Sequence, residues 1–144
     1  MNSMKTLVLM LSLTLLLFAA CSDDNITTPE THELVGTWNA DKFTTYWGSI
    51  SKPDSTFVFT FVSDYRFTLT ISDDYRWSAE SLFLAESNND LGGWWVDGDT
   101  LTLYGAGDGD EVYEYSLSGN KLTLTRSETT KGYTTFTVIE FTKQ

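Results

Sequence analysis

The strongest constraint on the fold is an alternation of apolar and hydroxyl-bearing residues that recurs from residue 34 to the end of the chain. In the run 55–62 phenylalanine occupies positions 57, 59 and 61, and in the run 121–126 Leu122 and Leu124 alternate with threonine. A period of two is typical of β-strands that bury one face and expose the other to water. No window of comparable length shows a helical period, so the sequence predicts an all-β protein.

Turn residues separate these alternating runs. Asp97-Gly98 tolerates the positive φ that a tight hairpin requires, and Ser118-Gly119-Asn120 fits the same role. Because the connections are short, successive strands are expected to pair with each other in an up-and-down meander. The predicted strands are 34–43, 55–62, 65–71, 76–85, 92–96, 100–104, 111–117, 121–126 and 133–142.

A sheet of this size would expose two hydrogen-bonding edges unless it closed on itself. We therefore predict a single antiparallel up-and-down β-barrel of eight to nine strands, and a two-sheet sandwich is the alternative. Aromatic side chains, 15% of the residues, can supply its core. The last strand is ambiguous, because Phe136 and Val138 compete with Ile139 and Phe141 for the inner face.

The first 20 residues have the pattern of a signal peptide. Lys5 precedes an apolar run of about a dozen residues, whereas a membrane-spanning helix needs about 20. The following Ala19-Ala20-Cys21 resembles the lipobox of bacterial lipoproteins, in which the cysteine carries acyl chains such as palmitate. This resemblance implies that Cys21 is lipidated and anchors the protein to a bilayer. The alternative is an ordinary secretory signal followed by a chance cysteine.

Ser22, directly after the cysteine, resembles the sorting pattern for the outer membrane, so we expect an outer-membrane lipoprotein of the cell envelope, on the periplasmic face or the cell surface. Residues 21–32 have no periodicity and contain Pro29, which predicts a flexible tether ahead of one domain at 33–144. His32 is the only histidine in the chain, and we predict that it is a solvated tether residue rather than a metal ligand or a base.

Loss of the signal peptide would leave 124 residues, enough for one domain, with eight basic and 20 acidic side chains and a formal charge of −12. This charge disfavours binding to nucleic acid and favours a soluble monomer. Cys21 is the only cysteine in the chain, so no disulfide within the domain is expected.

No catalytic or metal-binding pattern is present in residues 33–144. Without a histidine or a thiol there, nucleophilic catalysis lacks its usual partners, so we expect no enzyme activity and no cofactor. The segments 97–99 and 108–111 are acidic and contain glycine, but neither matches the twelve-residue spacing of a calcium loop. Hairpin turns on an acidic surface account for both segments.

Three segments together resemble the lipocalin-like domains found in many small bacterial lipoproteins: Leu34-Val35-Gly36-Thr37-Trp38, the glycine and two tryptophans at 93–95, and the segment 118–125. The resemblance covers nearly all of residues 33–144. It implies that Trp38 packs across the closed end of the barrel beneath a basic residue. Lys143 of the last strand and Arg126 of the preceding strand are the candidates for that residue.

The resemblance also implies that a small apolar ligand occupies the barrel mouth. We expect Tyr46 and Trp47 to contact it from a loop at 43–51, and Trp77 and Trp95 to contact it from inward-facing strand positions, with core packing as the alternative for each. The predicted function is a membrane-anchored lipoprotein that binds a small hydrophobic or amphipathic molecule, and its expected partners are that ligand and the bilayer.

An acidic module that binds or inhibits another protein is the alternative function. The two differ in how full the lumen is. A cavity of about 300 Å³ or more favours the carrier, because small-molecule pockets begin near that size. A filled lumen favours the interaction module, and the side chains expected to fill it are Phe57, Phe59, Phe67, Tyr113 and Tyr115.

Overall fold

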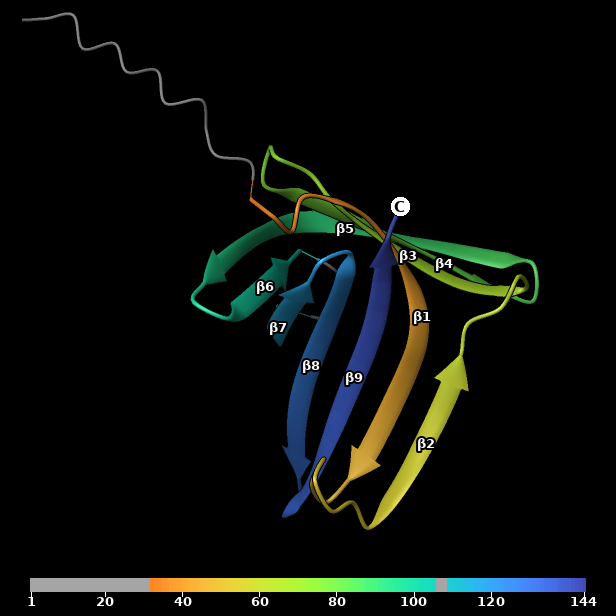
Figure 1. Cartoon of the computed structure of the whole chain (residues 1–144), viewed down its shortest axis with the longest axis vertical. Helices are drawn as coiled ribbons and strands as arrows, with labels where there is room; N and C mark the ends of the chain where they lie inside the picture. Colours follow the sequence, from red (N-terminus) through yellow and green to blue (C-terminus); the bar gives the residue numbers. More distant parts are fainter. Residues whose placement is uncertain (1–31, 106–108) are drawn as a thin grey trace, which may run out of the picture. The chain divides into compact units, whose positions relative to one another are not determined.

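The protein folds as an antiparallel sheet of nine strands (Figure 1). The computed structural model describes residues 32–105 and 109–144; the predicted signal peptide and Cys21 lie outside these residues. Within the described ranges there is no helix long and apolar enough to cross a bilayer. The strands are β1 (Gly36–Trp47), β2 (Ser55–Thr60), β3 (Tyr65–Ile71), β4 (Arg76–Phe83), β5 (Glu86–Asp97), β6 (Thr100–Tyr104), β7 (Glu111–Ser118), β8 (Lys121–Thr130) and β9 (Tyr133–Lys143).

Eight of these strands close into a barrel, and the ninth lies outside the closure. The strands pair in the order β1-β3-β4-β5-β6-β7-β8-β9, and β9 returns to pair with β1. β2 pairs only with β1. The predicted up-and-down barrel is therefore confirmed, with eight strands in the closed barrel, and the sandwich alternative is wrong.

One edge of β1 is divided between two partners. Its first residues, 36–39, pair with β3, and residues 42–47 pair with β2. Its other edge pairs with β9 along most of its length. In Figure 1, β2, β1, β9 and β8 lie side by side, while β3, β4 and β5 run across their ends. The barrel is therefore closed where β1 meets β3 and open where β1 meets β2.

The division of β1 coincides with a β-bulge at Asp41, where the pairing with β9 shifts by one residue. The Asp41 carboxylate accepts hydrogen bonds from the Thr142 hydroxyl at 2.5 Å and the Lys121 ammonium at 3.0 Å. Burial alone would raise the pKa of Asp41, but these hydrogen bonds and the charge of Lys121 outweigh burial and lower it. The bulge is thereby fastened to β8 and β9.

The strand register assigns each side chain to one face of the barrel, because directly paired residues share a face. Phe141 pairs with Ala40 and Leu122, and all three are buried. Ile139 shares their face, so Phe136 and Val138 point outward, which removes the ambiguity in the last strand. The largest fully buried side chains are Trp38, Phe141, Leu34, Leu69, Ile71, Leu101, Leu122 and Leu124.

Trp38 fills the closed end of the barrel. Its indole N–H donates to the Leu34 carbonyl at 2.8 Å, and the Lys143 ammonium lies 5.0 Å from the centroid of its ring. Gly36 has a φ of +147°, and the Lys143 side chain occupies the space where a Cβ of residue 36 would be. Because residue 36 is a glycine, the Lys143 side chain has room to place its ammonium over the Trp38 ring. Arg126 lies elsewhere and pairs with Glu111.

We predict that Asp41→Asn removes part of the pH dependence of folding stability. Because the pKa of Asp41 is lower in the folded state, its contribution is fully present above about pH 5 and is lost as the pH falls through the folded-state pKa. The difference in unfolding free energy between wild type and Asp41→Asn, measured by urea unfolding, should therefore shrink between about pH 7 and pH 3. Asp64→Asn, at an exposed turn, is the control. A difference that does not change with pH would contradict the assignment.

Candidate functional site

A cavity of about 200 Å³ lies inside the barrel, above the core at the closed end. Most of its lining is apolar and comes from five strands: Phe67, Leu69, Trp77, Leu103, Leu124 and Ile139. The volume is below the threshold of about 300 Å³ for a typical ligand pocket. It is nevertheless larger than the roughly 150 Å³ apolar cavity that suffices to hold benzene. The lumen alone can therefore accept a single ring or a short alkyl chain.

One side of this lumen cavity is polar. The Tyr113 hydroxyl donates to Glu111 at 2.7 Å, and Arg126 pairs with the other oxygen of the same carboxylate at 3.5 Å. Burial, followed by the hydrogen bond and the charge of Glu111, raises the pKa of Tyr113 well above its ordinary value. Tyr113 therefore stays protonated and remains a donor. Asp90 adds a second carboxylate to the lining.

Aromatic rings continue from the lumen to the open end of the barrel. Phe67 lies 5.9 Å from the core residue Phe141 and 6.5 Å from Phe61, measured between ring centroids. Further rings follow at centroid separations of 5.2–6.0 Å: Phe61 to Phe59, Phe59 to Tyr65, and Tyr65 to Phe83. Phe57 is 51% exposed, and Phe59 is half-buried. The interaction-module alternative requires these two rings to fill the lumen. They do not, because neither ring lines the lumen cavity.

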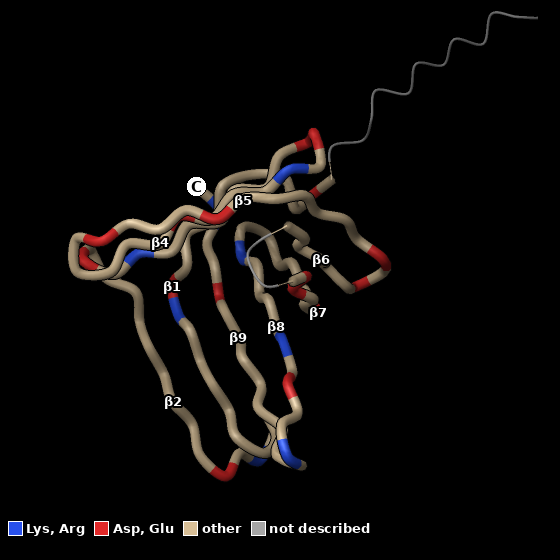
Figure 2. Tube along the Cα trace, turned by 180° about the vertical axis from the view of Figure 1, so that it is seen from behind, with Lys and Arg blue, Asp and Glu red and all other residues tan. Residues whose placement is uncertain are grey.

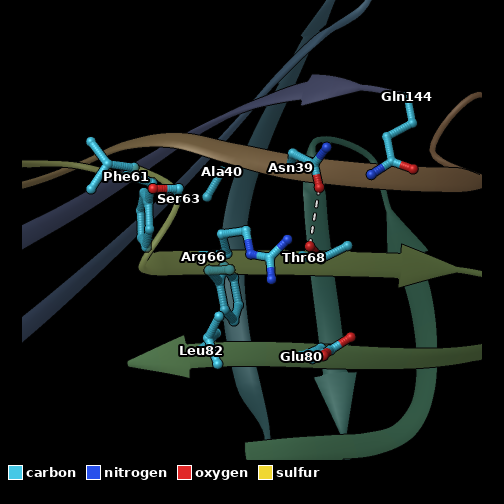
Figure 3. Close-up of a pocket in the computed structure, with 11 residues that line it drawn as sticks. Asn39, Ala40, Phe61, Ser63, Arg66, Thr68, Glu80, Leu82 and Gln144 are labelled. Atoms are coloured by element: carbon cyan, nitrogen blue, oxygen red, sulfur yellow. Dashed lines mark hydrogen bonds between the residues drawn. The ribbon is translucent and has the colours of Figure 1, made fainter. Parts of the chain in front are cut away.

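A second cavity, of about 460 Å³, opens through the barrel wall where β1 leaves β3 (Figure 3). We call it the wall groove. Ala40, Phe61, Phe67 and Leu82 supply its apolar lining. Its polar side chains include Asn39, Arg66, Thr68 and Glu80. The groove exists because the chain between β2 and β3 turns away from β1 beyond the last β1–β3 pair, Asn39 with Thr68.

The polar side chains of the wall groove come from three neighbouring strands. The Thr68 hydroxyl donates to the Asn39 side-chain carbonyl at 3.0 Å, and Figure 3 shows Arg66 beside this hydrogen bond. Glu80 pairs with Thr68 across β3 and β4 and so shares its face. Within the described part of the chain no carboxylate forms an ion pair with Arg66. The groove therefore presents a cationic donor and an anionic acceptor above an apolar lining.

Phe67 is common to the two cavities. It lines the wall groove and also lines the lumen cavity. Its ring is half-buried and rests against Phe61 on one side and Phe141 on the other. One aromatic side chain therefore stands between the opening in the wall and the interior of the barrel.

Of the two tryptophans predicted to face inward, Trp77 does so and Trp95 does not. Trp77 is 4% exposed, lines the lumen cavity and donates its indole N–H to the Tyr104 carbonyl at 3.3 Å. Trp95 is 50% exposed on the outer face, so its predicted inward orientation is wrong. Trp77 pairs with Gly92, which places position 92 inside the barrel. Alternation along β5 then turns Trp94 inward and Trp95 outward.

The predicted loop at 43–51 is also wrong in its first half, because β1 continues to Trp47. Tyr46 pairs with Phe136, which points outward, so Tyr46 lies on the outer face. Trp47 is on the inner face and 41% exposed. It pairs with Ser55 and Thr135, and neither of these residues lines the lumen cavity. Neither residue lines the lumen cavity or the wall groove.

His32 differs from its prediction as a solvated tether residue. It is half-buried, and its ring meets Trp94 edge-on with a centroid separation of 5.6 Å. Its carbonyl accepts a hydrogen bond from the Val35 N–H at 2.8 Å. The ring therefore packs on the barrel. Within the described residues, no three His, Cys, Asp or Glu side chains are grouped as a metal site requires.

A sequence model of the family described as "Lipocalin-like domain" matches residues 34–124. The match begins at the segment that contains Gly36 and Trp38 and ends within β8. The chain belongs to the lipocalin-like domain family. The family resemblance seen in the sequence is thereby confirmed. No curated protein matches the chain at a significant level.

We predict that Tyr113→Phe lowers the free energy of unfolding by about 1 kcal/mol, because the lumen side of Glu111 loses its buried donor. Tyr115→Phe is the matched control. Tyr115 lies on the same face of the same strand, and its hydroxyl has no hydrogen-bond partner among the described residues. Urea unfolding of both variants measures the difference. Equal effects of the two substitutions would show that the Tyr113–Glu111 bond contributes nothing to stability.

Proposed function

We propose that the barrel binds a small amphipathic molecule through the lumen cavity and the wall groove together. The observation that carries the proposal is the position of Phe67, which borders both cavities. A rotation of this ring would join the two spaces. An apolar end of the ligand would then lie against Leu69, Leu103 and Ile139, and the rest would extend through the wall.

Size supports two cavities rather than the lumen alone. The lumen cavity, about 200 Å³, accommodates only a ring or a short chain. The wall groove, about 460 Å³, is within the range of small-molecule pockets. A molecule larger than one ring therefore needs the groove.

The polar side chains of the wall groove suit the head group of such a ligand. Arg66 has no ion-pair partner among the described residues, so its guanidinium is available to an oxygen acceptor. Glu80 and Asn39 offer acceptors close by. A head group with both donors and acceptors fits this set.

Native mass spectrometry on residues 25–144, purified gently from a bacterial host, tests the proposal directly. Residues Thr31–Gln144 form one compact unit, so this fragment contains the complete barrel. We predict a discrete added mass that is lost on denaturation. A neutral naphthylamine dye should bind with increased fluorescence and should compete with the extracted guest.

Two substitutions localise the bound molecule. Ala79 lines the lumen cavity, and Ala79→Phe should fill it and weaken binding by about tenfold or more. Ser78→Phe places the same ring on the exposed outer face of β4 and is the control. Arg66→Gln, on an exposed side chain, should weaken binding of the natural guest without changing the unfolding midpoint. A wild-type protein that carries no guest and does not bind the dye would exclude the carrier function.

We also propose that the barrel is held at the outer membrane by acyl chains on Cys21. Support comes from the sequence alone: the apolar run, Ala19-Ala20-Cys21 and the serine that follows. The full chain expressed in a bacterial host should incorporate labelled palmitate and fractionate with membranes. Cys21→Ser should abolish both. Labelling that survives this substitution would place the acyl chain elsewhere and contradict the proposal.

A further inference from the structure

The outer edge of β2 is an unpaired strand edge of unusual composition. Among the described residues, β2 pairs only with β1. Its sequence, Ser-Thr-Phe-Val-Phe-Thr, contains no charge, no proline and no glycine. Figure 2 shows β2 without a charged residue along its length. Natural proteins usually protect such edges with lysine, proline or a bulge.

Other partly unpaired strands of this barrel do carry charges. The stretch 86–91 of β5 has no partner on one side and contains Glu86 and Asp90. The stretch 126–130 of β8 is also open on one side and contains Arg126 and Glu128. β2 instead exposes apolar side chains on both faces: Phe57 is 51% exposed and Val58 is 54% exposed. This edge is therefore suited to pairing with another strand.

The hydrogen bonds around β1 show which backbone groups of β2 are available. Phe61 N–H donates to the Asp41 carbonyl at 3.0 Å, and this bond flanks the pair Lys42–Thr60. In an antiparallel ladder such flanking bonds mark a pair that is not itself hydrogen-bonded, and the two kinds of pair alternate. Phe57 and Phe59 therefore bond to β1. The N–H and C=O groups of Thr56, Val58 and Thr60 point to the open edge.

The sequence of this edge is a palindrome. Residues 56–60 read Thr-Phe-Val-Phe-Thr in both directions, with Val58 at the centre. In an antiparallel pair of two such strands centred on Val58, the available groups of Thr56, Val58 and Thr60 meet those of Thr60, Val58 and Thr56. Each matched pair can form two backbone hydrogen bonds. Phe57 lies opposite Phe59 on the inner face, in an aromatic pair of the kind that stabilises sheets.

We infer that β2 is an interface for a second copy of this chain, joined edge to edge about a two-fold axis at Val58. Such an interface is isologous, so it closes at two copies and does not propagate. The charge of −12 favours a monomer, because it makes two copies of the protein repel each other. The β2 edge itself carries no charge, so this repulsion does not act directly at the proposed interface. Higher salt should strengthen the dimer. The inference does not depend on ligand binding.

Disulfide cross-linking of the full chain in bacterial membranes tests this register. At the axis the two Val58 Cα atoms would be about 5.5 Å apart, within the range that a disulfide spans. Val58→Cys should therefore give a covalent dimer under mild oxidation. The control is Val112→Cys, since Val112 is a valine of similar exposure, 51%, on another strand. Wild type, which contains Cys21, gives the background.

The register is tested by a second set of variants. Thr56→Cys alone should not cross-link, because the two copies of residue 56 would lie four residues apart along the strands. Thr56→Cys combined with Thr60→Cys should restore the dimer. Val58→Cys cross-linking at least fivefold above Val112→Cys, with this register dependence, supports the inference. Equal cross-linking of the two valine variants, or efficient cross-linking of Thr56→Cys alone, overturns it.

Discussion

The division of one edge of β1 between β3 and β2 is the constraint on which the rest of the structure depends. An ordinary barrel strand keeps one neighbour on each side, but β1 exchanges β3 for β2 at the bulge of Asp41. The wall groove lies at this exchange. The exposed edge of β2 lies beyond it, and so do the aromatic rings that lead out of the lumen. The wall groove and the β2 edge, two of the surfaces to which we assign a binding role, therefore both lie where β1 changes its partner.

The closed end of the barrel contributes most to the stability of the fold, and the open end carries the side chains that are available for recognition. At the closed end, Trp38 and Phe141 are completely buried, and burial of a large apolar side chain stabilises the fold by about 1.5–3 kcal/mol. At the open end the aromatic rings remain half-exposed or exposed, because β1, β2, β8 and β9 continue past the closed part of the sheet. Side chains there contribute less to folding, so they can contact a ligand or a second molecule.

The fold could be predicted because its signals are local. Period-two alternation and turn residues located all nine strands, since side chains alternate between the two faces of a strand and each turn requires specific backbone angles. The exchange at Asp41 could not be predicted. In the sequence, Asp41 and Lys42 look like any two consecutive exposed residues, and nothing marks Asp41 as a bulge. The extension of β1 to Trp47 was missed for a related reason. Thr44 and Thr45 interrupt the alternation without ending the strand.

The candidate site was predictable only in part. Trp77 lies at an inward position of a regular strand, so alternation placed it correctly. Trp94 and Trp95 are adjacent, and only the pairing of Gly92 with Trp77 decides which of the two faces inward. Arg66 and Phe67 become important through the gap between β1 and β3, which depends on register and not on composition.

The position of the first strand has a mechanical consequence. Tension applied to the chain ahead of Leu34 would pass into β1 along its axis, between β9 on one side and β3 on the other. Backbone hydrogen bonds in antiparallel sheets lie perpendicular to the strands, so this load would shear many bonds at once and would not open them one by one. The indole of Trp38 is buried in the core and hydrogen-bonded to Leu34, so it would oppose the sliding of β1 along its neighbours. A load directed along β1 would therefore be carried by both of its ladders and by the buried Trp38 together.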